Sequence, residues 1–537
     1  MKKKIILNIL MFLAVVSICH AQRKLKYTID SDNNLVLAGY EIVPPDNGDE
    51  YDRSKTTYLS RLEVEPYVAG KKVVGIAKNA FCGDDKLYVV KIPATIEFIG
   101  NHAFTACKIN EFTIAPENTR YKVEDGFLID KKNNSLVSVF AKGEEITVPD
   151  GVEEIPDEFF YVLSRYTGGI KKINLPESVK RIGERAFEKM SSLTTVNIPS
   201  KIEYIGDNAF NKCTSLSIEV TLPETLTYLG TEAFAETKIT SLKLPGNMTS
   251  IPDRTFVNCY SLKSVRLPKN LKSIGNESFS GCNKIEGLIL PDTLEYIGKE
   301  GLSAVKFPKL VIPKAMTVIP SESFMNCGIN EIVFHSKVTD IGMRAFYRNS
   351  IEELTIPKTV KSIGASAFYQ CHIKSLKIEN GVKTIGGTAF YDNDIAELTL
   401  PDSVISIGSA AFSDNRITKL VLPKKITKLE ENVFADNLLT ELNLPKTITY
   451  IGKGAFDSNW LKTVILPEKL EYIGAGALHA SEYYGDLREI KIPAKVSYIG
   501  NSAFSKETTV YVKKGSYAQK WCEDPTNRAT IYTFKTY

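Results

Sequence analysis

The sequence predicts a solenoid of mainly parallel β-strands, with short 3₁₀ or helical turns and about 18 repeats of 22–24 residues. Two observations predict it. The motif Ile-Gly-x-x-Ala-Phe recurs along most of the chain, and it reads without substitution at 99–104, 205–210, 363–368, 451–456 and 499–504. An alternating apolar pair, such as Leu376 and Ile378, recurs between the motifs. Such a short period indicates stacked units, because one unit cannot bury its apolar face alone.

The first residues of the chain predict export. Lysines at positions 2–4 are followed by an apolar stretch over 5–18 and then by a site with small side chains. This pattern is typical of a secretory signal peptide, here residues 1–21, and it is too short to span a membrane. A lipid-modified Cys19 is the alternative, although Ile18 stands where such a site needs a small residue.

The net charge gives no reason to expect an anionic partner. Cleavage after Ala21 removes three lysines and no acid, which lowers the formal charge from +4 to +1. Nucleic acids and anionic membranes are bound by a clear excess of positive charge. No later segment has the roughly 18 consecutive apolar residues of a membrane span. We therefore expect neither nucleic-acid binding nor a membrane span.

The repeats divide the mature chain into three regions. Residues 22–70 have alternating strand character and are expected to form an N-terminal β cap. The solenoid is expected over 71–506, with an inserted hairpin at about 121–140 where the spacing between motifs is too long. Residues 507–537 are expected to form a C-terminal cap, because exposed terminal strands invite edge-to-edge association.

Within one repeat, each part of the sequence predicts a local structure. Leu376 and Ile378 alternate with polar residues and predict a half-buried strand. A proline usually ends this strand, because it cannot donate a hydrogen bond to the ladder. Gly364 marks a corner where a side chain would be crowded, and Phe368 then fills the core from a short turn.

The position three residues after the motif phenylalanine holds either cysteine or asparagine. It is Cys in six repeats and Asn in five: Cys107, Cys213, Cys259, Cys282, Cys327 and Cys371, and Asn349, Asn393, Asn415, Asn437 and Asn459. We interpret it as a structural position whose side chain satisfies backbone groups at a turn, and we call it the ladder slot. Free buried thiols are favoured, and a disulfide between neighbours such as Cys259 and Cys282 is the alternative.

Together, these features resemble a known class of repeat. The period, the spacing of the leucines and the ladder slot are similar to a leucine-rich repeat. The Ile-Gly-x-x-Ala-Phe corner and the Leu-Pro strand end look like the BspA-like class of bacterial leucine-rich repeats, over about residues 71–506. The resemblance implies a leucine-rich-repeat solenoid in an exported or surface protein. It also implies partners such as the host matrix proteins fibronectin and fibrinogen, which members of the class bind.

No motif in the sequence predicts catalysis. The four histidines of the mature chain, which are His102, His335, His372 and His479, lie in different repeats without metal-ligand spacing. Nucleophile-elbow, P-loop and dinucleotide-binding motifs are missing. We therefore predict a non-enzymatic protein with no cofactor and no catalytic or metal site.

Two rows of residues are candidates for partner binding. The first row comprises outward-facing strand positions, among them Arg266, Ile289, Val333, Lys377, Val421 and Ile465. The second row follows the motif phenylalanine in three consecutive repeats and consists of Tyr347, Tyr369 and Tyr391. Strand propensity alone also explains exposed valine, and edge shielding also explains the tyrosines.

These observations lead to two hypotheses. The first is an exported, non-catalytic binding or adhesion protein that presents an extended repeat surface to extracellular proteins. The alternative is a glycan-binding or cell-envelope scaffold protein whose tyrosines stack on sugar rings. Either would be located at the cell surface or secreted, with the periplasm as a further alternative.

Overall fold

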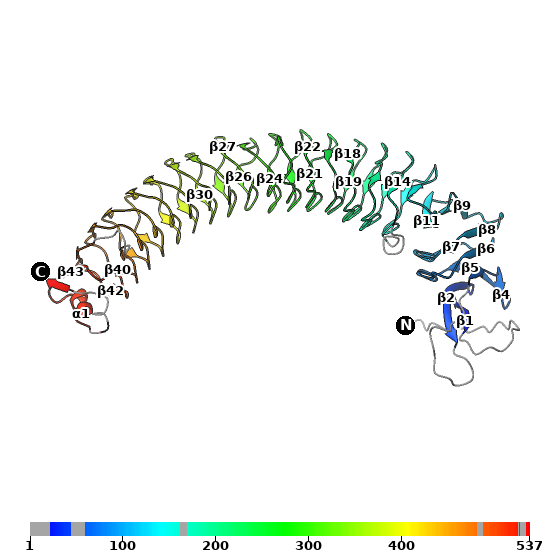
Figure 1. The fold of residues 1–537 in the computed structure, drawn as a ribbon, viewed down its shortest axis with the longest axis horizontal. Helices are drawn as coiled ribbons and strands as arrows, with labels where there is room; N and C mark the ends of the chain where they lie inside the picture. The colour runs from blue at the N-terminus through cyan, green and yellow to red at the C-terminus, as the bar shows by residue number, and fades with distance from the viewer. Residues whose placement is uncertain (1–21, 44–59, 162–168, 481–486, 525, 527–532) are drawn as a thin grey trace. The chain divides into compact units, whose positions relative to one another are not determined.

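The computed structural model describes residues 22–43, 60–161, 169–480, 487–524, 526 and 533–537. The predicted signal peptide, residues 1–21, lies outside the described residues. The chain forms two compact units, Met1–Pro245 (unit 1) and Gly246–Tyr537 (unit 2). Both units are built from repeats that contribute a first strand and then a shorter second strand, so the predicted parallel β-solenoid is confirmed (Figure 1).

The strands of unit 1 follow this order. The first strands are β3 (Arg61–Glu63), β6 (Val89–Ile92), β8 (Glu111–Ile114), β12 (Glu145–Thr147), β14 (Lys172–Asn174), β16 (Thr195–Val196), β18 (Glu219–Thr221) and β20 (Ser241–Lys243). The second strands are β5 (Lys71–Ile76), β7 (Phe98–Ile99), β13 (Glu154–Ile155), β15 (Arg181–Ile182), β17 (Tyr204–Ile205) and β19 (Tyr228–Leu229).

Unit 2 continues the same alternation. The first strands are β22 (Ser264–Arg266), β25 (Lys309–Val311), β27 (Glu331–Val333), β29 (Glu353–Ile356), β31 (Ser375–Ile378), β33 (Glu397–Thr399), β35 (Lys419–Val421), β37 (Glu441–Asn443), β39 (Thr463–Ile465) and β41 (Glu489–Lys491). The second strands are β21 (Ser250–Ile251), β23 (Ser273–Ile274), β24 (Tyr296–Ile297), β26 (Val318–Ile319), β28 (Asp340–Ile341), β30 (Ser362–Ile363), β32 (Thr384–Ile385), β34 (Ser406–Ile407), β36 (Lys428–Leu429), β38 (Tyr450–Ile451), β40 (Tyr472–Ile473) and β42 (Tyr498–Ile499).

Strands of one kind pair in parallel with the equivalent strands of the next repeat. Leu354 of β29 lies opposite Leu376 of β31, and Ile363 of β30 lies opposite Ile385 of β32. The register therefore equals the sequence period, and every side chain stacks on its equivalent one repeat away. This explains why the apolar positions of the sequence repeat so strictly.

The motif phenylalanines form the centre of the core. Within each unit they stack face to face, with ring centroids 4.9 to 5.7 Å apart. Phe368, for example, is fully buried between Phe346 and Phe390. Each ring therefore completes the apolar surroundings of its neighbours, as the sequence predicts for this position.

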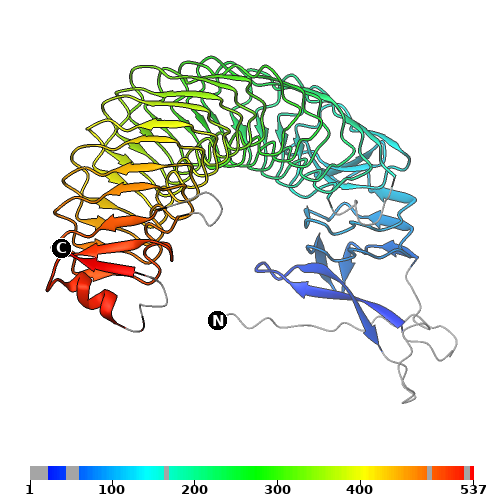
Figure 2. The same ribbon diagram turned by 60° about the vertical axis from the view of Figure 1, so that its left-hand side comes forward.

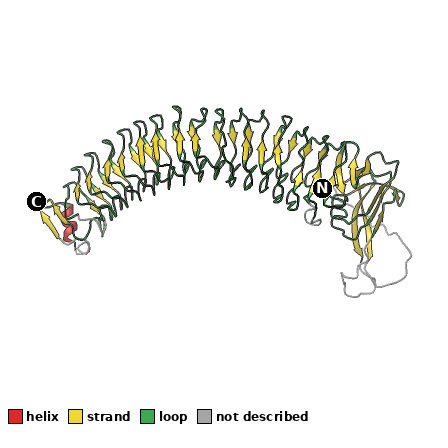
Figure 3. Cartoon of the chain, turned by 45° about the horizontal axis from the view of Figure 1, so that its top comes forward, coloured by secondary structure: helices red, strands yellow, loops and turns green. Residues whose placement is uncertain are grey.

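The segments around Ala-Phe are hydrogen-bonded turns rather than helices. Two residues of most corners adopt the left-handed conformation, for example Ser366 with φ 55° and Gln370 with φ 52°. Both donate their N–H groups to the next repeat, to Gly387 O and Tyr391 O. These bonds between repeats satisfy the backbone and interrupt any helix. Among the described elements, the one helix is α1 (Tyr517–Glu523), drawn red in Figure 3.

The glycine of the Ile-Gly corner is required by close stacking. A Cβ atom on Gly364 would lie 2.5 Å from the backbone nitrogen of Met343 in the preceding repeat. The φ of Gly364 is not positive, so the restriction is crowding by a neighbouring backbone. The sequence predicts crowding at this corner, and the structure identifies the preceding repeat as its source.

The ladder slot satisfies backbone groups of adjacent repeats, as predicted. The Asn393 side chain accepts the Cys371 and Ile373 N–H groups at 3.2 and 2.9 Å, and it donates to Phe368 O at 2.9 Å. Cys371 Sγ donates to Phe346 O at 3.0 Å. All cysteines in the described part of the chain are free thiols, including Cys259 and Cys282.

Non-repetitive elements adjoin the repeats. In unit 1, β1 (Gln22–Ile29) and β2 (Leu35–Val43) form an antiparallel hairpin, and both β2 and β4 (Tyr67–Val68) pair with β5 (Figure 2). In unit 2, β43 (Thr509–Val512) pairs with β41 and with β44 (Thr533–Thr536). α1 places Trp521 edge-on against Phe504, with ring centroids 6.2 Å apart. These elements lie in the regions for which we predict caps.

The insertion in unit 1 contains three antiparallel strands. They are β9 (Tyr121–Glu124), β10 (Phe127–Asp130) and β11 (Ser135–Val139). The sequence pattern suggests one continuous strand over 121–130. The structure divides it, because Asp125 and Gly126 adopt positive φ and form a tight turn. Ser135 of β11 then pairs with Glu154 of β13.

Candidate functional site

In unit 2, outward positions on the first strands, and the equivalent position at Ile289, carry exposed apolar side chains. The fractional exposures are 82% for Ile289, 55% for Val311, 37% for Val333, 46% for Val421 and 62% for Ile465. We call these five residues the apolar row. Because contiguous exposed apolar surface often marks an interaction site, the row is a candidate contact face.

Stacking of the repeats places part of the apolar row side by side. Val311 lies directly opposite Val333 in the β25–β27 pair. Ile289 is predicted to lie on a strand as well, but the structure assigns it to none, and it holds the equivalent sequence position one repeat before Val311. Sequence reasoning missed Val311, although it lies 22 residues from both Ile289 and Val333. Val421 and Ile465 lie two repeats apart, with the polar Asn443 between them. Val311 and Val333 are therefore adjacent, and together with Ile289 we call them the apolar patch.

The other two predicted strand residues occupy the same position in the repeat. Arg266 ends β22, one repeat before Ile289, and its side chain is exposed. Lys377 lies between the two parts of the apolar row, and its ammonium group is 3.7 Å from the Glu379 carboxylate. Both are cations, in repeats that come before and after the apolar patch in the sequence.

Charged residues beside the apolar patch neutralise one another. Lys309 and Glu331 precede Val311 and Val333 by two residues, so they lie on the same side of their strands. Their charged groups are 2.7 Å apart, and both side chains are more than half exposed. Such a pair contributes little stability and little net field. The patch therefore favours a partner surface that is apolar and close to neutral.

The three predicted tyrosines form a continuous stack. The ring centroids of Tyr347 and Tyr369 are 5.0 Å apart, and those of Tyr369 and Tyr391 are also 5.0 Å apart. The guanidinium of Arg348 lies 5.1 Å from the ring centroid of Tyr347. Burial raises the pKa of Tyr369 and Tyr391, so both phenols stay protonated at neutral pH.

This stacking limits what the tyrosines can bind. Both faces of Tyr369 are covered by its neighbours, and sugar binding by stacking needs an open ring face. The tyrosines also lie on the turn after the motif phenylalanine, whereas the apolar row, apart from Ile289, lies on the first strands. The structure therefore does not bring the two predicted rows into one site.

Comparison with known families identifies the repeats. The family model described as "BspA type Leucine rich repeat region (6 copies)" matches residues 58–129, 138–263, 249–372, 317–440 and 361–484. These segments cover most of the chain. The chain belongs to the BspA type leucine-rich repeat family. The resemblance inferred from the Ile-Gly-x-x-Ala-Phe corner is thus confirmed.

Solved structures include other bacterial leucine-rich repeat proteins. A leucine-rich repeat protein from Bacteroides ovatus is 20% identical, with 97% of this chain and 99% of that chain covered and a TM-score of 0.40. A leucine-rich cell surface protein from Faecalibacterium prausnitzii is also 20% identical, with coverages of 79% and 96% and a TM-score of 0.37. The pneumococcal vaccine antigen PcpA is 17% identical, with coverages of 78% and 98% and a TM-score of 0.35. No curated protein matches the chain in sequence.

Leucine-rich repeat families with this solenoid fold are typically non-catalytic. In the described part of this member, no group of three or more His, Cys, Asp or Glu side chains could hold a metal ion. The histidines have separate partners: His335 Nε2 lies 3.0 Å from Met316 O, and His479 Nδ1 lies 3.1 Å from Asp457 Oδ1. Among the described helices, none is long and apolar enough to cross a membrane.

Proposed function

We propose that this protein is an exported, non-catalytic binding protein whose apolar row contacts an extracellular protein. The observation that carries the proposal is the apolar patch: Val311 and Val333 lie side by side, Ile289 holds the equivalent position one repeat earlier, and all three are exposed on a solenoid whose other apolar positions are largely buried. Because the flanking charges are paired, the partner surface contributes apolar side chains and little net charge. Fibronectin and fibrinogen are the first partners to test, since the family resemblance suggests them.

Export is supported by the sequence of residues 1–21 and by the description of the Faecalibacterium prausnitzii protein as a cell surface protein. Protease treatment of intact cells, followed by mass spectrometry, tests this part of the proposal. We expect a mature N-terminus at Gln22 and cleavage of the intact protein by external protease. Full protection until the outer envelope is broken would place the protein in the periplasm and contradict a surface role.

The binding proposal is tested by removing apolar surface without disturbing the core. The mature protein is passed over immobilised fibronectin and fibrinogen, beside a variant with Ile289→Ser, Val311→Thr and Val333→Thr. We expect at least about a tenfold loss of affinity, since exposed apolar anchors at the centre of an interface often contribute more than 1 kcal/mol each. Thermal unfolding should be almost unchanged, because all three side chains are exposed.

Matched controls are available on another sheet of unit 2. Ile405 and Val318 are 58% and 47% exposed and lie beside or within second strands, outside the apolar row. Ile405→Ser with Val318→Thr should leave binding intact. Equal loss in both variants, or no binding of either matrix protein by the wild type, would contradict the proposal. If the wild type instead self-associates and the row variant does not, the apolar row contacts a second copy of this chain.

A further inference from the structure

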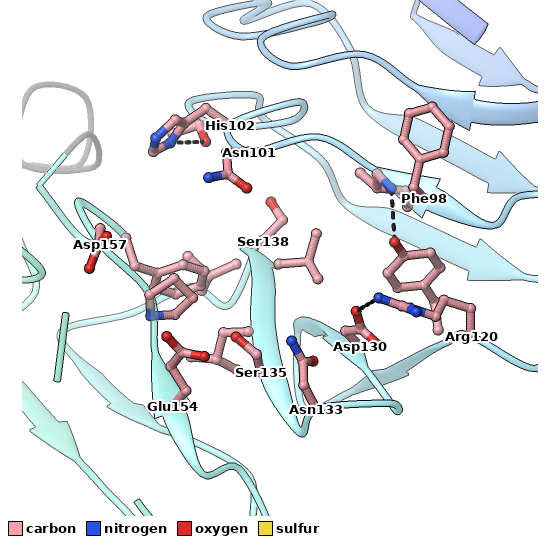
Figure 4. Close-up of a pocket in the computed structure, with 18 residues that line it drawn as sticks. Phe98, Asn101, His102, Arg120, Asp130, Asn133, Ser135, Ser138, Glu154 and Asp157 are labelled. Carbon is pink, nitrogen blue, oxygen red and sulfur yellow. Dashed lines mark hydrogen bonds and ion pairs between the residues drawn. The ribbon is translucent and has the colours of Figure 1, made fainter. Parts of the chain in front are cut away.

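A cavity of about 350 Å³ lies in unit 1, where the insertion interrupts the stacking of the second strands. It is lined by β7 with its following turn, by β9 to β11 and by the end of β13 (Figure 4). On one side β7 pairs with β5. On the other side the Ile99 N–H donates to the Tyr121 hydroxyl at 2.8 Å rather than to a neighbouring strand. The cavity therefore occurs at a defined break in the sheet.

A β-bulge brings two serines to the face of β11 that lines this cavity. Leu128 pairs with Ser138 and Ile129 pairs with Leu136, so Val137 is an extra residue with no partner on β10. Residues three apart on a regular strand face opposite sides, but the extra residue returns Ser135 to the side of Ser138. Both serines line the cavity, together with Asp130, which pairs with Ser135. Bulges often redirect side chains in this way beside binding sites.

The two serines are largely buried residues whose hydroxyls have no protein partner. Ser135 is 7% exposed and Ser138 is 5% exposed. Neither hydroxyl has a hydrogen-bond partner among the described residues, and neither is among the fully enclosed unpartnered polar atoms, so both stay accessible from the cavity that the two serines line. Figure 4 shows Ser138 near the middle of the lining residues, with Asn101 and His102 on one side and Ser135 and Glu154 on another. These hydroxyls are thus placed to bind a molecule inside the cavity.

The charged groups of the lining are already paired within the protein. Arg120 Nη2 lies 2.6 Å from Asp130 Oδ2. The guanidinium of Arg181 lies 3.0 Å from the Glu154 carboxylate and 2.9 Å from the Asp157 carboxylate. Because Arg181 serves two carboxylates, the two arginines and three carboxylates of this group leave one excess negative charge. A neutral ligand suits such surroundings better than an anionic one.

The remaining polar groups can both donate and accept hydrogen bonds. They include the amides of Asn101 and Asn133, which have no hydrogen-bond partner in the described part of the chain. Burial lowers the pKa of His102, so its imidazole is mainly neutral at pH 7. Phe98 also lines the cavity (Figure 4), with its ring lying against Gly75. Hydroxyls and amides that can both donate and accept match the hydroxyl groups of a sugar.

We propose that this cavity binds a small, neutral, polyhydroxylated molecule about the size of a monosaccharide. Its volume lies at the lower end of the range for small-molecule sites, which begins near about 300 Å³. The site is independent of the apolar row, because every residue that lines it belongs to unit 1. Failure of either proposal therefore leaves the other intact.

Ligand-observed NMR on the intact mature protein tests the site. The probes are glucose, galactose, mannose, N-acetylglucosamine and myo-inositol, with glucuronate and glucosamine as charged counterparts. We expect saturation transfer to at least one neutral probe. The Ser135→Ala, Ser138→Ala double variant should weaken that binding at least about tenfold, since two hydrogen-bonding groups are lost. Its melting temperature should stay the same or rise, because no protein hydrogen bond is removed.

Two further variants keep the test decisive. Asn133→Ala changes an exposed lining residue, so it should reduce binding with no effect on folding. Ser178→Ala is the matched control: its Oγ donates to Val152 O at 2.7 Å and lies outside the cavity, so it should lower the melting temperature but leave binding unchanged. The proposal would be overturned if no neutral probe showed saturation transfer, or if only charged probes bound. Unchanged binding in the double serine variant would also overturn it.

Discussion

At the ladder slot, asparagine and cysteine satisfy the same turn in different ways. The Asn393 side chain accepts two N–H groups of the preceding repeat and donates to Phe368 O. A thiol can provide the donor but is a weak acceptor. Where Cys371 holds the slot, its own carbonyl accepts the Ile351 N–H at 2.8 Å instead. Burial raises the pKa of Cys371 to about 12, so the thiol keeps the proton that it donates.

Substitutions at Cys371 should therefore depend on hydrogen bonding more than on size. Cys371→Asn should change the free energy of unfolding by less than about 1 kcal/mol, because asparagine occupies the adjacent slots. Cys371→Leu should cost about 2–4 kcal/mol, since it adds volume to a packed core and removes the bond to Phe346 O. Urea denaturation of the three proteins measures the difference. Equal damage by asparagine and leucine would show that the slot is a packing position.

Reading the sequence by residue type succeeds where a side chain has one physical role. The motif phenylalanine is buried, the corner glycine is crowded and the ladder slot binds backbone groups, and the sequence predicts all three roles. The sequence does not predict the left-handed positions, because Ser366, Gln370 and their equivalents are ordinary polar residues. Their conformation comes from hydrogen bonds to the next repeat, which no single repeat encodes. The cavity was missed for a similar reason: the bulge at Val137 depends on register with β10.

At the scale of the element, one corner of unit 2 forms a row of like charges. Asp392, Asp414 and Asp436 hold the same left-handed position in successive repeats. Burial raises the pKa of Asp414, and the nearby Asp392 raises it further. Burial also raises the pKa of Asp436, as do Asp457 and Asp414. Stacking identical repeats thus brings like charges together, which opposes folding at neutral pH.

We expect the folded state to become more stable when the carboxylates of this row are neutralised, by an amount that depends on pH. A carboxyl group with a raised pKa in the folded state favours folding when protonated, so its contribution is lost as pH rises through the folded pKa. The Asp414→Asn, Asp436→Asn variant should therefore melt at a higher temperature than the wild type at pH 7. The difference should shrink as pH falls and vanish below about pH 3, where both proteins are neutral at these positions.

Asp402 is a control, because the pKa of its carboxyl group is shifted in the opposite direction. Hydrogen bonds from the Lys424 backbone and side chain lower its pKa, so its ionised form favours folding. Asp402→Asn should lower the melting temperature at pH 7 and have no effect at low pH. Calorimetry from about pH 2 to about pH 8 measures both variants. Destabilisation of the double variant at pH 7 would mean that these aspartates make favourable contacts in solution.

At the scale of the whole chain, contacts extend mainly from one repeat to the next. Within each unit, strands pair with the equivalent strands of adjacent repeats, and core rings stack in the same order. Stability is then close to a sum of repeat and interface contributions, so one region can open while others stay folded. This also lets the family's repeat vary at outward positions, such as the apolar row, without cost to the core.

Loss of one core ring should therefore damage the chain locally. Phe368→Ala removes a fully buried ring stacked 5.2 Å from Phe346 and 5.3 Å from Phe390, and it should cost about 3–5 kcal/mol. Phe504→Ala should cost less, because Phe504 meets one aromatic ring, Trp521, edge-on near the end of the repeats. Limited proteolysis should cut Phe368→Ala first within about residues 355–400, where the opened repeats expose their backbone. Simultaneous loss of protection throughout unit 2 would instead show that its repeats unfold as one cooperative body, and the nearest-neighbour description would then be wrong.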